Sequence, residues 1–332
     1  MTAAILAVDG GNSKTDVALV AADGAVLGTV RGPTTSHQAV GLERGMDRLV
    51  ALVEDAAAQA GLDRAARPLA RLGVYAIAGA DYPPDVRLLD RALVVTRLSA
   101  EVVVENDTIG ALWAGSSTGW GIALICGEGI NGAAIAPDGR RVRFDGVGDI
   151  SGDWGGGHSV GMAGLAAAVR AADGRGPQTS LATLVPAQFG FRRPATLTRA
   201  LYEGRIANRR ISELSPTVFA AAAAADGDAV ARSIVDRLAD ELVAMATALA
   251  RRARLTRLPV EVVLAGGVFR ATDERFYERI RSGIAAVVPA ARLVRLDVPP
   301  VAGPALEGLA RLGALDEAAR QRIREGLRAF GR

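Results

Sequence analysis

The feature that most constrains the fold is a three-strand pattern that occurs twice along the chain. Near the N-terminus, Ala3–Val8, Asp16–Ala21 and Ala25–Arg31 are largely apolar segments separated by the turn residues Gly10-Gly11 and Asp23-Gly24. The pattern predicts a meander of three strands. Alternating helix and strand signals follow it up to residue 114.

The second copy begins near residue 119. Gly119–Cys126, Ala133–Ala136 and Arg140–Phe144 read as strands separated by Gly127–Gly132 and Pro137-Asp138-Gly139. The two halves share this order of elements but no sequence identity. An architectural repeat of this kind predicts an α/β fold of two domains with a cleft between them.

Helical periodicity then dominates the second half. The longest predicted helix is Ala229–Arg252, and a strand after it ends at Gly266-Gly267. We expect domains of residues 1–115 and 116–332. The second should carry a helical insertion near 155–225, and the final helices should pack back on the first domain.

Composition excludes several classes of protein. Half of the residues are hydrophobic and 23% are charged, which excludes a disordered regulator. The net charge of +3 is spread along the chain, so no nucleic-acid partner is expected. The chain shows neither a signal peptide nor an apolar run long enough for a membrane span, and we expect a cytoplasmic protein. Cys126 is the only cysteine, which excludes an internal disulfide.

Lys14 is the only lysine among 39 basic residues. Codon bias in a GC-rich genome would replace lysine by arginine wherever any cation suffices. A surviving lysine indicates a position where a compact ammonium is needed, although chance survival stays open.

Lys14 belongs to a turn with phosphate-binding chemistry. It is not a Walker A loop, because Ser13 precedes the lysine where that motif has glycine, and because a strand follows instead of a helix. Small residues still expose backbone N–H groups, and Asp9 at the strand end could hold Mg²⁺ through water. An ordinary hairpin turn is the alternative. The predicted nucleotide contacts are Gly11, Asn12, Ser13, Lys14 and Thr15.

Two further glycine segments are candidates for nucleotide binding. Gly127–Gly132 matches G-x-G-x-x-G, but a strand follows it, so a Rossmann site is excluded and a second phosphate loop fits better. Gly266-Gly267 follows a strand and could let adenine approach the backbone, or could be a plain turn. The predicted contacts are Gly127, Gly129, Asn131, Gly266 and Gly267.

These motifs resemble the superfamily of actin, hexokinase and the heat-shock chaperone ATPases. Within it, the chain resembles the family of BadF/BadG/BcrA/BcrD-type ATPases and N-acetylglucosamine kinases. The resemblance rests on five motifs in order: Asp9–Thr15, Glu105-Asn106-Asp107, Gly127–Asn131, Gly266-Gly267 and Pro299–Gly308. It implies two ribonuclease-H-like domains, with ATP and Mg²⁺ as cofactors.

The resemblance also implies a sugar site. Asp107 would be the general base that takes the proton from the attacking hydroxyl, although it could also cap the helix Thr108–Ala114. Asn106 could bind a ring hydroxyl. The glycine-rich segment from Gly146 resembles the sugar-side loop of the family. The predicted sugar contacts are Ser36, Asn106, Asp107, Gly146, Asp149 and Asp153.

Two departures from N-acetylglucosamine kinases point to a different acceptor. Trp154 stands where they typically have glutamate, and Glu128 stands in a loop where they usually have Gly-Thr-Gly-Ser. The carboxylates of Asp107, Asp149 and Asp153 would attract a free ammonium. The chain also resembles an actinobacterial glucosamine kinase, so we expect glucosamine over N-acetylglucosamine. Alternatively, Asp149 and Asp153 only bind backbone N–H groups of their own loop.

The rival class is an ATP-driven switch without a sugar acceptor. Activating ATPases of the same branch bridge an iron–sulfur cluster with two thiolates from each subunit, and a single cysteine cannot supply them. A regulatory module that has lost catalysis stays open. The expected partners are a sugar and a nucleotide, with no membrane; a homodimer also stays open.

Overall fold

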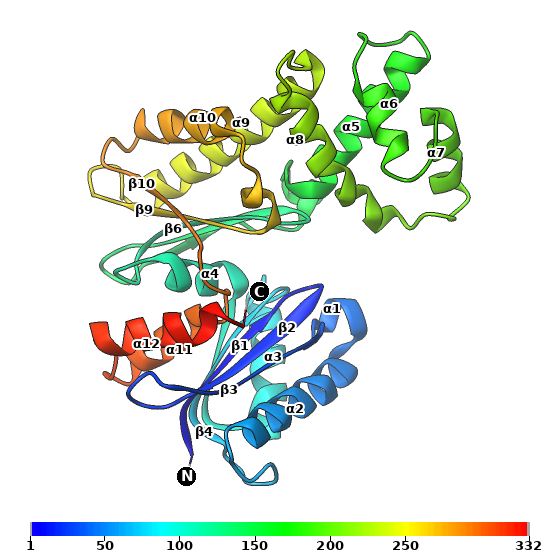
Figure 1. The fold of residues 1–332 in the computed structure, drawn as a ribbon. Helices are drawn as coiled ribbons and strands as arrows, with labels where there is room; N and C mark the ends of the chain where they lie inside the picture. Colours follow the sequence, from blue (N-terminus) through cyan, green and yellow to red (C-terminus); the bar gives the residue numbers. More distant parts are fainter. Residues whose placement is uncertain (1, 331–332) are drawn as a thin grey trace. The chain divides into compact units, whose positions relative to one another are not determined.

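The computed structural model describes residues 2–330 and contains two five-stranded sheets with helices (Figure 1). This confirms the predicted α/β class. The first sheet has the strand order β3-β2-β1-β4-β5 and the second the order β10-β9-β6-β7-β8. The strands of the first sheet are β1 (Ala3–Gly10), β2 (Lys14–Val20), β3 (Val26–Pro33), β4 (Ala70–Ile77) and β5 (Ser99–Asn106).

The first sheet combines the predicted meander with parallel strands. β1 pairs antiparallel with β2, and β2 with β3, whereas β1–β4 and β4–β5 are parallel. Helix α2 (Leu42–Gln59) leads from β3 to β4, α3 (Pro83–Thr96) joins β4 to β5, and α4 (Asp107–Gly115) follows β5. The carboxyl ends of β1, β4 and β5 therefore lie at the same edge of the sheet. The short helix α1 (His37–Val40) was not predicted.

Helices cover both faces of this sheet. Leu6 and Val8 pack in a core with α2 and α3, whereas Ile5 and Ala7 pack in a second core with the C-terminal helices. This alternation follows from the two-residue period of a strand. The C-terminal helices are α11 (Ala302–Arg311) and α12 (Glu317–Arg328).

The described residues form two compact units. Unit 1 comprises the residues up to Ala123, Ala133–Arg141 and the residues from Val294 on; unit 2 comprises Leu124–Gly132 and Val142–Leu293. Because these units interleave along the chain, the division at residue 115 stays a prediction. No helix within residues 2–330 is both long and apolar enough to cross a bilayer.

The helical insertion is confirmed, and helix α9 (Ala229–Arg252) has the predicted bounds. Helix α10 (Glu274–Ala285), which Asp273 caps, was not predicted. The strands of the second sheet are β6 (Gly121–Cys126), β7 (Ile130–Ile135), β8 (Arg141–Arg143), β9 (Glu261–Ala265) and β10 (Arg292–Arg295). Between β8 and α9 lie the 3₁₀ segments η1 (Gly148–Ser151) and η2 (Asn208–Leu214), with α5 (Gly156–Ala172), α6 (Leu181–Ala187), α7 (Pro194–Tyr202) and α8 (Ser215–Ala223); η3 (Gly267–Arg270) follows β9.

Candidate functional site

The predicted first phosphate turn joins β1 to β2 in unit 1. It is closed by a 2.9 Å hydrogen bond from the Gly11 N–H to the carbonyl of Lys14. Asn12, Ser13 and Lys14 are exposed, as a ligand-binding turn requires. Thr15 is different, because its hydroxyl is buried and lies 2.9 Å from the hydroxyl of Thr35. Its position argues against direct contact of that hydroxyl with a ligand.

Three charged residues lie directly opposite one another on β1, β2 and β3. Asp9 faces Asp16, and Asp16 faces Arg31. The Arg31 guanidinium donates two hydrogen bonds to the buried Asp16 carboxylate, at 2.7 and 2.8 Å. The Lys14 ammonium lies 3.8 Å from Asp16. Asp16 is therefore compensated by two cations, and Asp9 beside it is not paired in the same way.

Asp9 has a strongly perturbed acidity. Its pKa is raised from 3.8 to about 7, mainly by burial and then by the Asp107 and Asp16 carboxylates, and Lys14 and Arg31 lower it only in part. Like charges close together disfavour a second ionisation. The same surplus of negative charge would be relieved by a bound dication.

The residues around Asp9 fit a Mg²⁺ ion bound together with a nucleotide. Within residues 2–330, no group of three or more His, Cys, Asp or Glu could hold a metal by itself. Mg²⁺ needs no such cage, because it keeps several waters and takes one or two carboxylates plus phosphate oxygens. Asp9 supplies one such carboxylate, and the nearby charge of Asp107 adds to the attraction for a cation.

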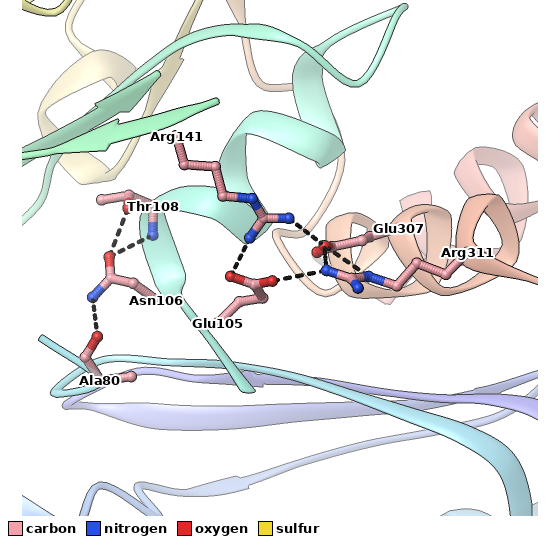
Figure 2. Close-up of polar contacts among 7 residues, drawn as sticks. All are labelled: Ala80, Glu105, Asn106, Thr108, Arg141, Glu307 and Arg311. Atoms are coloured by element: carbon pink, nitrogen blue, oxygen red, sulfur yellow. Dashed lines mark hydrogen bonds and ion pairs between the residues drawn. The ribbon is translucent and has the colours of Figure 1, made fainter. Parts of the chain in front are cut away.

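Asp107 is the first residue of α4, and Asn106 is the residue that caps this helix. The Asn106 side-chain oxygen accepts hydrogen bonds from the Thr108 N–H, at 3.1 Å, and the Thr108 hydroxyl, at 2.6 Å (Figure 2). Its amide nitrogen donates to Asp81 at 3.0 Å and to the Ala80 carbonyl at 3.5 Å. The alternative role of Asp107 as helix cap is therefore wrong. Both polar groups of the Asn106 side chain are already hydrogen-bonded and orient the start of α4. This argues against the predicted contact of Asn106 with a sugar hydroxyl.

Ser36 lies in a segment that contacts both the first turn and the loop after β4. The Thr34 hydroxyl donates to the Gly11 carbonyl at 2.8 Å, and the His37 ring lies against Gly79. The Ser36 hydroxyl is buried and has no hydrogen-bond partner within the described residues. Its predicted sugar contact would need this segment to move.

The second glycine loop, between β6 and β7 in unit 2, is hydrogen-bonded to the first turn of helix α5. This contact was not predicted from the sequence. The Gly157 N–H donates to the Gly127 carbonyl at 2.8 Å, and the His158 N–H donates to the Glu128 carbonyl at 2.9 Å. Both donors belong to the first turn of α5. A Cβ on Gly156 would lie 2.5 Å from the carbonyl oxygens of Glu128 and Gly129, so only glycine allows this approach.

The glycines of the two predicted nucleotide motifs in unit 2 differ in what they contact. Gly266 is required by packing, because its Cβ would lie 2.4 Å from the Cys126 carbonyl oxygen, which places this motif against the end of β6. By contrast, a Cβ on Gly127, Gly129 or Gly267 would meet no atom within 4 Å. Close approach of a ligand would explain why these three are glycine.

The predicted sugar-side loop contacts the start of β7, directly after the second glycine loop. A Cβ on Gly146 would lie 2.1 Å from the Asn131 amide nitrogen. Asp149 is exposed and its carboxylate accepts no hydrogen bond from the described residues, whereas the Asp153 carboxylate accepts one from the Ser151 hydroxyl. The alternative that both carboxylates bind backbone N–H groups of their loop finds no support among these hydrogen bonds. The Arg237 guanidinium lies 3.9 Å from the centre of the Trp154 ring and stacks on it.

Comparison with known proteins places this arrangement in a family. The family model described as "BadF/BadG/BcrA/BcrD ATPase family" matches residues 6–308. The chain belongs to this ATPase family. It is 25% identical over 297 residues to the "N-acetylmuramic acid/N-acetylglucosamine kinase" of Clostridium acetobutylicum, covering 88% of this chain and 94% of that protein.

Solved structures support the fold. A Chromobacterium violaceum structure with a provisional name as an N-acetylglucosamine kinase is similar with a TM-score of 0.72 and 23% identity, over 93% of this chain and 99% of that one. A ROK family glucokinase from Streptomyces griseus, in complex with glucose and AMPPNP, gives a TM-score of 0.54 at 20% identity, over 93% and 98% of the two chains. The BadF-type chain therefore has the actin-like ATPase fold of sugar kinases.

Proposed function

We propose that the protein is an ATP-dependent sugar kinase that phosphorylates the 6-hydroxyl of glucosamine. One observation carries the kinase assignment: the first phosphate turn, Asp9 and Asp107 all lie at the carboxyl ends of parallel strands of one sheet. In open α/β sheets, ligands bind outside these ends. The kinase names of the curated relative and the solved structures agree with it.

The chemistry assigned to the residues of unit 1 is phosphoryl transfer. The Asp107 carboxylate takes the proton of the sugar 6-hydroxyl while the oxygen of that hydroxyl forms a bond to the γ-phosphorus of ATP. The bond from the γ-phosphorus to the bridging oxygen breaks, and ADP leaves. Lys14 and the N–H groups of its turn stabilise phosphate charge. Mg²⁺ bound near Asp9 would neutralise part of that charge. In unit 2, Gly127, Gly129 and Gly267 leave the backbone open to a nucleotide.

The choice of glucosamine rests on unpaired negative charge in unit 2. Asp145, Asp149 and Asp153 lie in one nine-residue stretch of the sugar-side loop, and none of their carboxylates makes an ion pair within residues 2–330. A free ammonium at carbon 2 of the sugar would be attracted to such a loop. The name of the Clostridium acetobutylicum relative favours N-acetylglucosamine instead, which makes this sugar the alternative acceptor.

A coupled ADP-release assay with ATP, Mg²⁺ and a panel of sugars tests this proposal. We expect kcat/KM to be highest for glucosamine and to fall at high pH as the amine loses its proton, while the glucose rate stays flatter. Asp149→Asn should weaken glucosamine binding by about 1.5–3 kcal/mol, the range for a charged hydrogen bond, and should matter less for glucose.

A preference for N-acetylglucosamine of about tenfold or more, equal to roughly 1.4 kcal/mol, would contradict the glucosamine assignment and leave the kinase assignment intact. ATP hydrolysis that no sugar stimulates would instead favour a regulatory ATPase.

A further inference from the structure

A closed ring of four charged side chains lies beside the end of β5 (Figure 2). Glu105 pairs with Arg141 from β8 and, at 2.9 Å, with Arg311 from α11. Glu307, also in α11, pairs with the same two arginines at 3.1 and 2.8 Å. Each carboxylate contacts both guanidiniums, so acidic and basic groups alternate around the ring and its formal charge is zero.

The carboxylates of this charge ring are more buried than its arginines. The Glu307 side chain is 1% exposed and the Glu105 side chain 14%, against 36% for Arg141 and 40% for Arg311. Burial, and then the Glu307 carboxylate, raise the pKa of Glu105. One Glu307 oxygen is buried without a hydrogen bond from the described residues. Desolvation makes such a network a weak source of stability, so a role in fixing geometry explains it better.

Helix α11 also contacts the chain on the other side of Asp107. A Cβ on Gly303 would lie 1.8 Å from the Gly110 carbonyl oxygen in α4, so the two helix backbones touch. The same helix carries Glu307 and Arg311, which hold Glu105 at the end of β5. Asp107 joins β5 to α4, and α11 therefore holds both elements that define its position.

We propose that the charge ring is a positioning device for Asp107. Glu105 and Glu307 do not act on the sugar themselves; they fix the end of β5 so that the Asp107 carboxylate meets the attacking hydroxyl. The inference rests on the proposed kinase function. Displacement of a catalytic group by about 1 Å can lower a rate roughly 100-fold, so a modest shift of β5 would be visible in turnover.

Glu105→Gln keeps the shape of the side chain and removes its charge. We expect kcat to fall about tenfold or more while the KM values for ATP and sugar stay within about threefold, since only the orientation of the base changes. Arg141→Met, at a partly exposed position, should give the same split if Glu105→Gln folds poorly. The matched control is Asp240→Asn, which removes the exposed 2.6 Å Arg279–Asp240 pair of unit 2 and should leave kcat unchanged.

A double-mutant cycle separates positioning from general support of the fold. In the Asp107→Asn background, Glu105→Gln should not lower the residual rate further, because the group that it orients is gone, although it should lower the melting temperature in both backgrounds. An equal loss of rate in both backgrounds would overturn the inference. So would an unchanged kcat in an active enzyme. A wild-type protein that phosphorylates no sugar would refute the proposed function, and the inference with it.

Discussion

The two units present ligand-binding candidates of different kinds. In unit 1 the candidates are charged side chains placed by the strands: Asp9, Asp16 and Arg31 lie in a row on β1, β2 and β3, and Asp107 follows β5 in the same sheet. In unit 2 the nucleotide candidates are glycine segments instead, some of them packed on other backbone, as where Gly266 meets Cys126. The phosphate and base candidates of unit 1 should therefore be sensitive to loss of a functional group, and the glycine segments of unit 2 to gain of a Cβ.

The largest effect should come from the proposed base in unit 1. Asp107→Asn keeps the size of the side chain but cannot take a proton, so kcat should fall by roughly 100-fold or more, the usual scale for a lost general base. Nucleotide binding, measured by calorimetry, should be retained. Asp47→Asn, at an exposed position of α2, is the matched control. Near-full turnover of Asp107→Asn would show that another group is the base.

The raised pKa of Asp9 predicts that Mg²⁺ affinity depends on pH. A proton competes with the cation below about pH 7, so the affinity of the nucleotide-bound protein should rise up to about tenfold per pH unit from pH 5 to 7 and level off above 8. Without Mg²⁺, the raised pKa of Asp9 in the folded state stabilises the fold fully below pH 3.8. This contribution is lost as the pH rises through about 7. Thermal melts with ADP, with and without Mg²⁺, measure both trends. Asp9→Asn should abolish them, and equal pH dependence in that variant would exclude Asp9 as their source.

Substitutions of Lys14 test whether the first phosphate turn needs a compact ammonium or any positive charge. Lys14→Ala should weaken nucleotide binding about tenfold, and Lys14→Arg should be impaired as well, because a planar guanidinium does not replace an ammonium in a tight turn. Sugar binding should change little in either variant. The measurement is the KM for ATP beside the KM for sugar. An unimpaired Lys14→Arg enzyme would mean that the single lysine of the chain is there by chance.

The smallest effect on turnover should come from a matched pair of glycines in unit 2. Gly129→Ala places a Cβ in open space, so stability should stay within about 0.5 kcal/mol while the KM for ATP rises a few-fold. Gly266→Ala places it 2.4 Å from a carbonyl at a φ of 111°, and should cost about 1–3 kcal/mol in the free energy of unfolding. Denaturant melts distinguish the two. Equal losses of stability would show that Gly129 has a packing role.

The strands of the meander in unit 1 could be predicted from the sequence, and part of their register could have been predicted as well. A turn sets the register of the two strands that it joins, and Asp23-Gly24 does so for β2 and β3. Counting outward from Asp23-Gly24 pairs Asp16 with Arg31, as the structure does. Counting from Gly10-Gly11 would pair Asp9 with Asn12, whereas the structure pairs Asp9 with Asp16, because the first turn is centred on Asn12-Ser13. Only the strands were predicted, because the turns were used as boundaries and not as fixed points of the register.

Other contacts had no local signal. The charge ring brings Glu105 together with Arg141 and Glu307, which are distant in sequence and come from different elements. The approach of α5 to the second glycine loop likewise depends on tertiary packing, although the run of glycines at 155–157 could have indicated a close backbone contact. The cap of α4 was assigned one residue late, because both Asn106 and Asp107 are good capping residues and only the backbone decides between them.

Identification of the phosphorylated product tests the central claim most directly. Incubation with ATP, Mg²⁺ and glucosamine, followed by ³¹P NMR, should show one new phosphomonoester, coupled to the protons of carbon 6, that forms in step with ADP. With Asp107→Asn the same signal should appear roughly 100-fold more slowly. If the γ-phosphoryl group appears only as inorganic phosphate, with glucosamine unchanged, the proposed amino-sugar kinase activity is wrong.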